Sequence, residues 1–201
     1  MTRLLFLPGA SGSGSFWQPV ASRLPAAWQK VCLDWPGLGE VPPDPNVTEL
    51  QDLLELVLRH TTNGPVDLVA QSMGGLVAIQ TALQRPHAVR RLVLTGTSGG
   101  IDLRPFDVYD WRPEYRAEFP DAARWITDTG HEDLAERLPE IGQPTLLLWG
   151  GADPISRPAV GAFLESNLPG ARLVIVPGVD HMFVRDVPDQ VAPLILNHLS
   201  L

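Results

Sequence analysis

Cysteine and long apolar runs are both scarce in this sequence. The single cysteine, Cys32, cannot form an internal disulfide, and its apolar neighbours favour a small buried hydrophobe over a reactive thiol. The longest apolar runs, such as residues 4–7 and 146–149, are far too short to cross a bilayer. The run at the N-terminus is also too short for a signal peptide. These features predict a cytoplasmic protein.

An excess of basic charge is also lacking. The chain carries 15 Lys and Arg against 23 Asp and Glu, a formal net charge of −8. This balance argues against nonspecific attraction to nucleic acid or to an anionic membrane surface, and it favours a small-molecule partner. With 201 residues, of which 44% are hydrophobic and 19% charged, we expect one globular domain over residues 1–201.

Short continuous apolar runs alternate with helical patterns. Continuous runs are typical of strands that are buried on both faces of a parallel sheet. The expected strands cover residues 4–7, 31–33, 66–70, 92–95, 145–149 and 173–176. The expected helices cover residues 48–60 (with Thr48 as N-cap), 73–84, 158–167 and 188–199. The pattern predicts the α/β class: a doubly wound, mainly parallel sheet of about six strands flanked by helices.

One interval is longer than a single connecting helix requires. We interpret residues 100–140 as an insertion that packs over the active end of the sheet as a small lid or cap. The alternative is a surface loop whose aromatic residues serve only to hold it in place. Trp111, Tyr109 and Phe106 are candidates for contact with a substrate, and Tyr115, Phe119 and Trp125 are further aromatic residues of the segment.

Ser72 lies where the expected strand 66–70 runs into the expected helix 73–84. A serine exposed on such a tight turn needs small residues two positions before and after it, here Ala70 and Gly74. Taken alone, so short a pattern also arises by chance.

Two further residues follow other strands. Asp153 comes just after the strand 145–149, where a turn aspartate or a helix cap is the alternative. His181 lies in the loop after the last strand. Serine, aspartate and histidine thus follow three different strands in that order, and parallel strands place their useful residues beyond their carboxyl ends.

This combination resembles the α/β-hydrolase superfamily over nearly the whole chain. The resemblance implies a trimmed fold, because the sequence begins at the family's third strand without the antiparallel strands that usually come first. It also implies a triad in which Ser72 is the nucleophile, His181 its base and Asp153 the acid that orients the base. Ala70, in place of the consensus glycine, and Pro8, where relatives usually have histidine, depart from the family pattern.

The resemblance also implies an oxyanion hole built from the backbone N–H groups of Met73 and Ala10. The glycine-rich loop at residues 7–12 could instead suggest phosphate binding. It lacks the lysine of a P-loop, however, and does not match the dinucleotide fingerprint. We therefore expect no cofactor and no metal.

Other residues compete for the same roles. Asp102 and Asp180 are rivals for the acid, and His131 could contact substrate. His60, His87 and His198 are expected at the surface.

The expected reaction is hydrolysis of a small carboxylester through an acyl-serine intermediate, as in carboxylesterases, with thioesters next. A C–C bond hydrolase or lyase with the same triad remains an alternative, as does a non-catalytic binding protein that retains the fold. We expect a monomer or homodimer.

Overall fold

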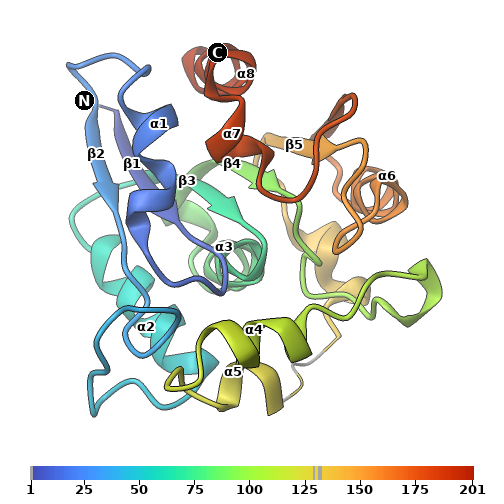
Figure 1. Cartoon of the computed structure of the whole chain (residues 1–201). Helices are drawn as coiled ribbons and strands as arrows, with labels where there is room; N and C mark the ends of the chain where they lie inside the picture. The colour runs from blue at the N-terminus through green and yellow to red at the C-terminus, as the bar shows by residue number, and fades with distance from the viewer. Residues whose placement is uncertain (1, 129, 131–132) are drawn as a thin grey trace.

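A six-stranded parallel sheet forms the centre of the protein. The computed structural model describes residues 2–128, 130 and 133–201, and its strand order is β2-β1-β3-β4-β5-β6 (Figure 1). All five strand pairings are parallel, which confirms the predicted fold class. The strands are β1 (Arg3–Leu7), β2 (Gln29–Cys32), β3 (Val66–Gln71), β4 (Val89–Thr95), β5 (Thr145–Gly150) and β6 (Ala171–Val176).

The two edge strands differ from the expected pattern of full burial. Residues of β3 and β5 are buried throughout, whereas β2 and β6 are largely half-buried or exposed. Ile175 of β6 is 45% exposed. An edge strand has a neighbour on one side only, so a continuous apolar run there does not imply burial on both faces.

Helices cover both faces of the sheet and enclose two apolar layers. Alternate residues of β1 point into different layers, because successive side chains of a strand face opposite sides. One layer lies under α2 (Leu50–His60), α3 (Met73–Gln84) and α6 (Pro158–Asn167). The other lies under α1 (Gln18–Ala21), α7 (Phe183–Asp186) and α8 (Pro188–Ser200), and Figure 1 shows α1 and α8 together on that side. Short 3₁₀ turns are η1 (Gly14–Trp17) and η2 (Pro86–Ala88).

Helix α2 begins two residues later than expected. Glu49, not Thr48, occupies the N-cap position, with extended backbone at φ −156°. The carboxylate of Asp52 accepts the N–H groups of Thr48 at 2.7 Å and of Glu49 at 3.1 Å. An acid in the first turn therefore satisfies the backbone N–H groups of the two residues that precede the helix. The prediction that Thr48 is the N-cap was wrong.

Segment 100–140 forms short turns and helices along one side of the molecule. They are η3 (Arg104–Phe106), α4 (Arg112–Glu118), α5 (Trp125–Asp128) and η4 (Ala135–Glu140). Figure 1 shows α4 and α5 close to the loop that follows β2. There the Ala123 N–H donates to the Gly37 carbonyl at 2.7 Å, and further along the segment the Tyr109 N–H donates to the Pro154 carbonyl at 2.8 Å. His131 lies outside the described residues.

Within the part of the chain that the structure describes, no helix combines the length and apolar character needed to span a bilayer.

Candidate active site

The site lies where the sheet changes direction. From β1 the chain moves to β2 on one side and then crosses to β3 on the other, and ligands of open α/β sheets bind beyond the carboxyl ends at such a point. Ala10 follows β1 and Ser72 follows β3, and both line a cavity of about 810 Å³. His181, which follows β6, lines the same cavity.

The backbone of Ser72 is strained. Its φ of 52° and ψ of −122° lie in a region that residues other than glycine rarely adopt. The Ser72 N–H donates to the Thr95 carbonyl at 2.9 Å, which ties the turn to β4. A Cβ on Gly74 would lie 2.4 Å from the Pro8 carbonyl oxygen, so the chain needs glycine there. Ala70 is fully buried and pairs with Leu7 of β1 and Leu94 of β4.

His181 and Asp153 form a buried pair. The Nδ1 atom of His181 lies 2.7 Å from Oδ2 of Asp153, and the side chains are 9% and 0% exposed. The other carboxylate oxygen, Oδ1, accepts the N–H groups of Ile155 and Ser156 at 2.9 Å each. With Oδ1 occupied, Oδ2 is the oxygen that receives the imidazole Nδ1–H. This tautomer leaves Nε2 of His181 as a proton acceptor. No hydrogen bond joins Ser72 to His181 in this conformation of the described residues.

Gly96 lies directly against this pair. Its φ is +49°, and a Cβ built on it would lie 3.0 Å from Oδ2 of Asp153 and 3.2 Å from Nδ1 of His181. Sequence reasoning missed this residue. The available signal was a glycine immediately after the strand that ends at Thr95.

The loop after β1 (residues 8–13, the β1 loop) is held by two buried tryptophans. The indole N–H of Trp17 donates to the Leu7 carbonyl at 3.0 Å, and that of Trp35 donates to the Pro8 carbonyl at 2.7 Å. Pro8, the departure from the family pattern, thus contributes a backbone carbonyl that an indole holds in place.

The β1 loop also passes close to the serine. A Cβ on Gly9 would lie 3.0 Å from the Ser72 Cβ. The Gly12 N–H donates to the Gly9 carbonyl at 3.1 Å, which fixes the peptide unit between Gly9 and Ala10. Because the N–H of a trans peptide points away from its C=O, the direction of the Ala10 N–H is fixed as well. Within the described chain, neither this N–H nor that of Met73, the first residue of α3, has an acceptor.

Of the three aromatic residues predicted to contact substrate, Trp111 lines the cavity. The structure places the other two elsewhere. Phe106 packs edge-on against Phe163 of α6, with ring centroids 5.8 Å apart. Tyr109 is 46% exposed, and its hydroxyl donates to the carboxylate of Glu114. The path of the segment, which the sequence does not reveal, turns both rings away from the cavity.

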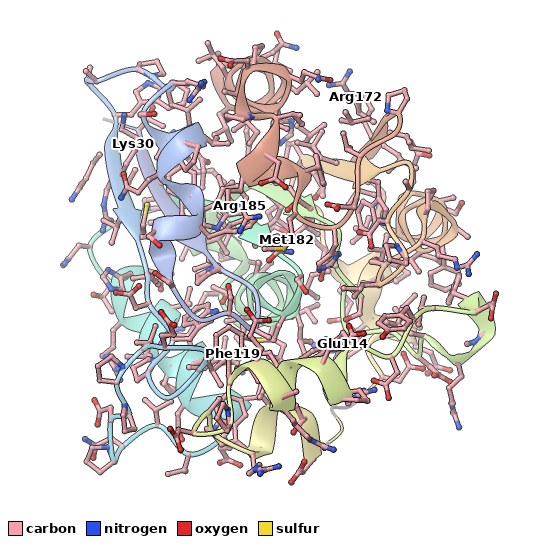
Figure 2. The ribbon with its side chains drawn as sticks, in the orientation of Figure 1. Lys30, Glu114, Phe119, Arg172, Met182 and Arg185 are labelled. Carbon is pink, nitrogen blue, oxygen red and sulfur yellow. The ribbon has the colours of Figure 1, made fainter. Side chains whose placement is uncertain are left out.

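Other residues of the cavity wall were not predicted. They come from α4, from the segments after β1, β2, β5 and β6, and from the residue before the serine. Figure 2 shows Glu114 on α4 and Phe119 directly after this helix, across from Met182 and Arg185 on the C-terminal segment. The further lining residues include Phe16, Asp34, Glu40, Gln71, Tyr115, Glu118 and Ile155.

The charge of the wall is mainly negative. Four carboxylates line the cavity, Asp34, Glu40, Glu114 and Glu118, against one guanidinium, that of Arg185. The Nε–H of that guanidinium donates a 2.8 Å hydrogen bond to the carboxylate of Asp186, which weakens the attraction of Arg185 for a ligand anion.

The rival residues lie in other arrangements. Asp102 forms a 2.7 Å ion pair with Arg104, and Asp180 accepts the Met182 N–H at 2.9 Å. His198 is only 8% exposed, which corrects its expected surface position, and burial lowers its pKa. Among the described residues, no group of three or more His, Cys, Asp or Glu side chains could hold a metal ion.

Comparison with known proteins identifies the family. Residues 2–125 match a family model described as the alpha/beta hydrolase fold, and residues 100–194 match a second model described as an alpha/beta hydrolase family. The chain belongs to the α/β-hydrolase family. It is a hydrolase.

Relatives and solved structures agree with this assignment. The chain is 26% identical to a pimeloyl-[acyl-carrier protein] methyl ester esterase of Neisseria meningitidis, over 89% of this chain and 86% of the relative. A thermophilic esterase from Thermogutta terrifontis has a TM-score of 0.80 at 21% identity, over 100% of this chain and 90% of that one. A meta-cleavage product hydrolase from Pseudomonas fluorescens has a TM-score of 0.78 at 18% identity, over 100% and 91%. The two structures show the fold alone.

Proposed function

We propose that the protein hydrolyses a small-molecule carboxylester with Ser72 as nucleophile, His181 as base and Asp153 as the acid that orients the base. One observation carries this proposal: a buried His181–Asp153 hydrogen bond of 2.7 Å lies beside the cavity that Ser72 also lines. Strain at Ser72 adds support, because strained backbone persists only where the surrounding structure enforces it, and such residues cluster at active sites.

The chemistry follows from the atoms. Nε2 of His181 takes the proton of the Ser72 hydroxyl as Oγ attacks the ester carbonyl carbon. Asp153 accepts the Nδ1–H and stabilises the imidazolium that forms. The tetrahedral intermediate then expels the alcohol, which receives the proton from Nε2. Water, deprotonated by the same nitrogen, attacks the carbonyl carbon of the acyl-serine. The second tetrahedral intermediate then collapses to the carboxylic acid, while Oγ of Ser72 takes the proton back from Nε2.

The backbone N–H groups of Met73 and Ala10 are the proposed oxyanion donors. Both lack an acceptor among the described residues, and Gly9 allows the β1 loop to approach the serine. Donors fixed before the reaction stabilise the developing negative charge without reorganisation, and loss of one typically costs about 10²–10³ in rate.

We further propose that the chain is one domain in which segment 100–140 is a lid. Trp111, Tyr115 and Phe119 from this segment contribute to the cavity wall. An ester is preferred as substrate because a relative at 26% identity is named a methyl ester esterase. Cytoplasmic location and a monomeric or homodimeric state stay predictions.

A fluorophosphonate probe tests the nucleophile. The cavity wall also holds Ser11, Ser13 and Ser15, so the labelled residue must be located by peptide mass spectrometry. We expect one adduct, on Ser72, in the wild type and in Ser11→Ala, none in Ser72→Ala, and hydrolysis of p-nitrophenyl acetate that is lost with the same variant. An unlabelled wild type, or equal labelling of Ser72→Ala, would overturn the proposal.

A further inference from the structure

Tyr115 of α4 connects the lid to two loops of the catalytic body. Its hydroxyl accepts the Gly39 N–H at 2.9 Å and donates to the Ala10 carbonyl at 2.8 Å. The residue is 8% exposed, and burial raises the pKa of the phenol, so the hydroxyl keeps the proton that it donates. Trp111 and Phe119 flank its ring, with centroids 5.4 and 5.1 Å away, and limit its movement.

The two loops that Tyr115 joins are in direct backbone contact. A Cβ on Gly12 would lie 2.3 Å from the Leu38 carbonyl oxygen, and one on Gly39 would lie 2.0 Å from the Ser11 carbonyl oxygen. Gly39 also has a φ of +54°, so glycine is required there on both grounds. A shift of the loop after β2 is therefore passed directly to the β1 loop.

Ala10 is held on both sides of its Cα. The Gly12 N–H fixes the preceding peptide through the Gly9 carbonyl, and Tyr115 fixes the following peptide through the Ala10 carbonyl. The N–H of Ala10, the proposed oxyanion donor, lies between these two anchors. Without the phenol, the following peptide is free to rotate and displaces Gly12 further along the loop. The Gly12 N–H then releases the Gly9 carbonyl, and the peptide that carries the Ala10 N–H turns away from the oxyanion.

We propose that Tyr115 is a positioning residue that holds the oxyanion hole in its working geometry from the lid. The inference rests on the proposed function, because it presupposes the role of the Ala10 N–H. It makes the lid part of the catalytic geometry: α4 must be docked for the donor to be in place. A second bond between the same parts, from the Ala123 N–H to the Gly37 carbonyl at 2.7 Å, supports this docked arrangement.

The test compares Tyr115→Phe with Tyr109→Phe. These are the two tyrosines of the chain. Tyr109 is not among the residues that line the cavity, and its hydroxyl donates to Glu114, an exposed carboxylate of the cavity wall whose charge the substitution leaves unchanged. For Tyr115→Phe we expect kcat on p-nitrophenyl acetate to fall at least tenfold, with KM changed less than threefold. An alkyl boronic acid, which forms a tetrahedral adduct, should bind more weakly by the same factor. Tyr109→Phe should match the wild type in all three measurements.

A merely structural role would not produce this split between kcat and KM. If Tyr115→Phe keeps kcat and boronic acid affinity within twofold of the wild type, the inference is wrong. Labelling of Ser72 by the fluorophosphonate in the wild type separates this failure from a failure of the proposed function.

A second experiment covers the case in which Tyr115→Phe does not fold. Biosynthetic incorporation of a polyfluorinated tyrosine into Tyr109→Phe places the analogue at position 115 alone. Ring fluorination lowers the phenol pKa, so the donor to Ala10 is lost at a lower pH. We expect kcat to fall with rising pH in the fluorinated enzyme where the unfluorinated one stays constant, and coincident profiles would overturn the inference.

Discussion

Replacement of Gly96 by alanine should damage the His181–Asp153 pair although neither residue of the pair is substituted. The added Cβ would lie 3.0 Å from Oδ2 of Asp153 and 3.2 Å from Nδ1 of His181. Carbon and oxygen or nitrogen atoms normally meet beyond these distances, so the pair has to retreat by a few tenths of an ångström. Misplacement by 1 Å costs about 10²-fold in rate, and on a logarithmic scale the expected loss in kcat is about threefold to tenfold.

The backbone adds a separate cost to the same substitution. At a φ of +49°, alanine is disfavoured by about 1–2 kcal/mol relative to glycine, and this should lower the free energy of unfolding. Gly64→Ala isolates that effect, because Gly64 has a φ of +103° with no atom within 4 Å of the added Cβ. Gly142→Ala, at an open position without positive φ, controls for the methyl group itself.

The measurements are urea unfolding and kcat on p-nitrophenyl acetate, together with the proton NMR signal of the His181 Nδ1–H. Gly96→Ala should lose both stability and kcat and should shift the Nδ1–H signal. Gly64→Ala should lose stability with kcat unchanged, and Gly142→Ala should change neither. If Gly96→Ala matches Gly64→Ala in all three measurements, the packing of Gly96 against the pair has no part in catalysis and the reasoning is refuted.

Three further predictions concern the acid, the cavity charge and a buried histidine. In Asp153→Asn, the Ile155 and Ser156 N–H groups hold the amide oxygen of the new side chain, so the amide NH₂ faces His181 and enforces the wrong tautomer of the imidazole. We expect kcat to fall about 10³–10⁴-fold with little change in Tm, and a loss under tenfold would contradict the triad. Because four carboxylates line the cavity, acetylcholine should have a lower KM than its uncharged isostere 3,3-dimethylbutyl acetate at low salt. Glu118→Gln should reduce the difference between the two KM values, and equal KM values in the wild type would refute an electrostatic effect. Burial lowers the pKa of His198 in the folded state, so the unfolded state binds the proton more readily as pH falls through about 6.5. Tm should therefore decline from pH 7.5 to 5.5 more steeply in the wild type than in His198→Gln, and parallel plots of Tm against pH would contradict this reasoning.

The fold and the triad candidates were predictable because a parallel sheet imposes their positions. The carboxyl ends of all strands of a parallel sheet lie along one edge, so residues that follow the strands closely lie at that edge. Ser72, Asp153 and His181 each follow a strand directly or within a short loop, and the structure places all three at that edge.

Residues whose position depends on the path of a loop were not predictable in the same way. Phe106 and Tyr109 were chosen for their aromatic character, but segment 100–140 turns one toward Phe163 and the other toward solvent. His198 was expected at the surface because it lies near the end of a helix, yet it is buried. Composition identifies the segment, and the contacts of its backbone decide which side chains reach the cavity.

Tyr115 is a residue whose role could not be predicted from the sequence. Its hydroxyl bonds residues 76 and 105 positions away in the chain, so no local spacing connects them. The glycines of the two loops do carry a signal: Gly12 and Gly39 sit where any side chain would collide with the opposite backbone. Glycines in the loops after adjacent strands of a parallel sheet therefore indicate loop-to-loop contact, and a buried aromatic hydroxyl between such loops is a candidate to hold them together. That rule directs attention to the lid as a structural part of the oxyanion hole, and not only as a cover for the substrate.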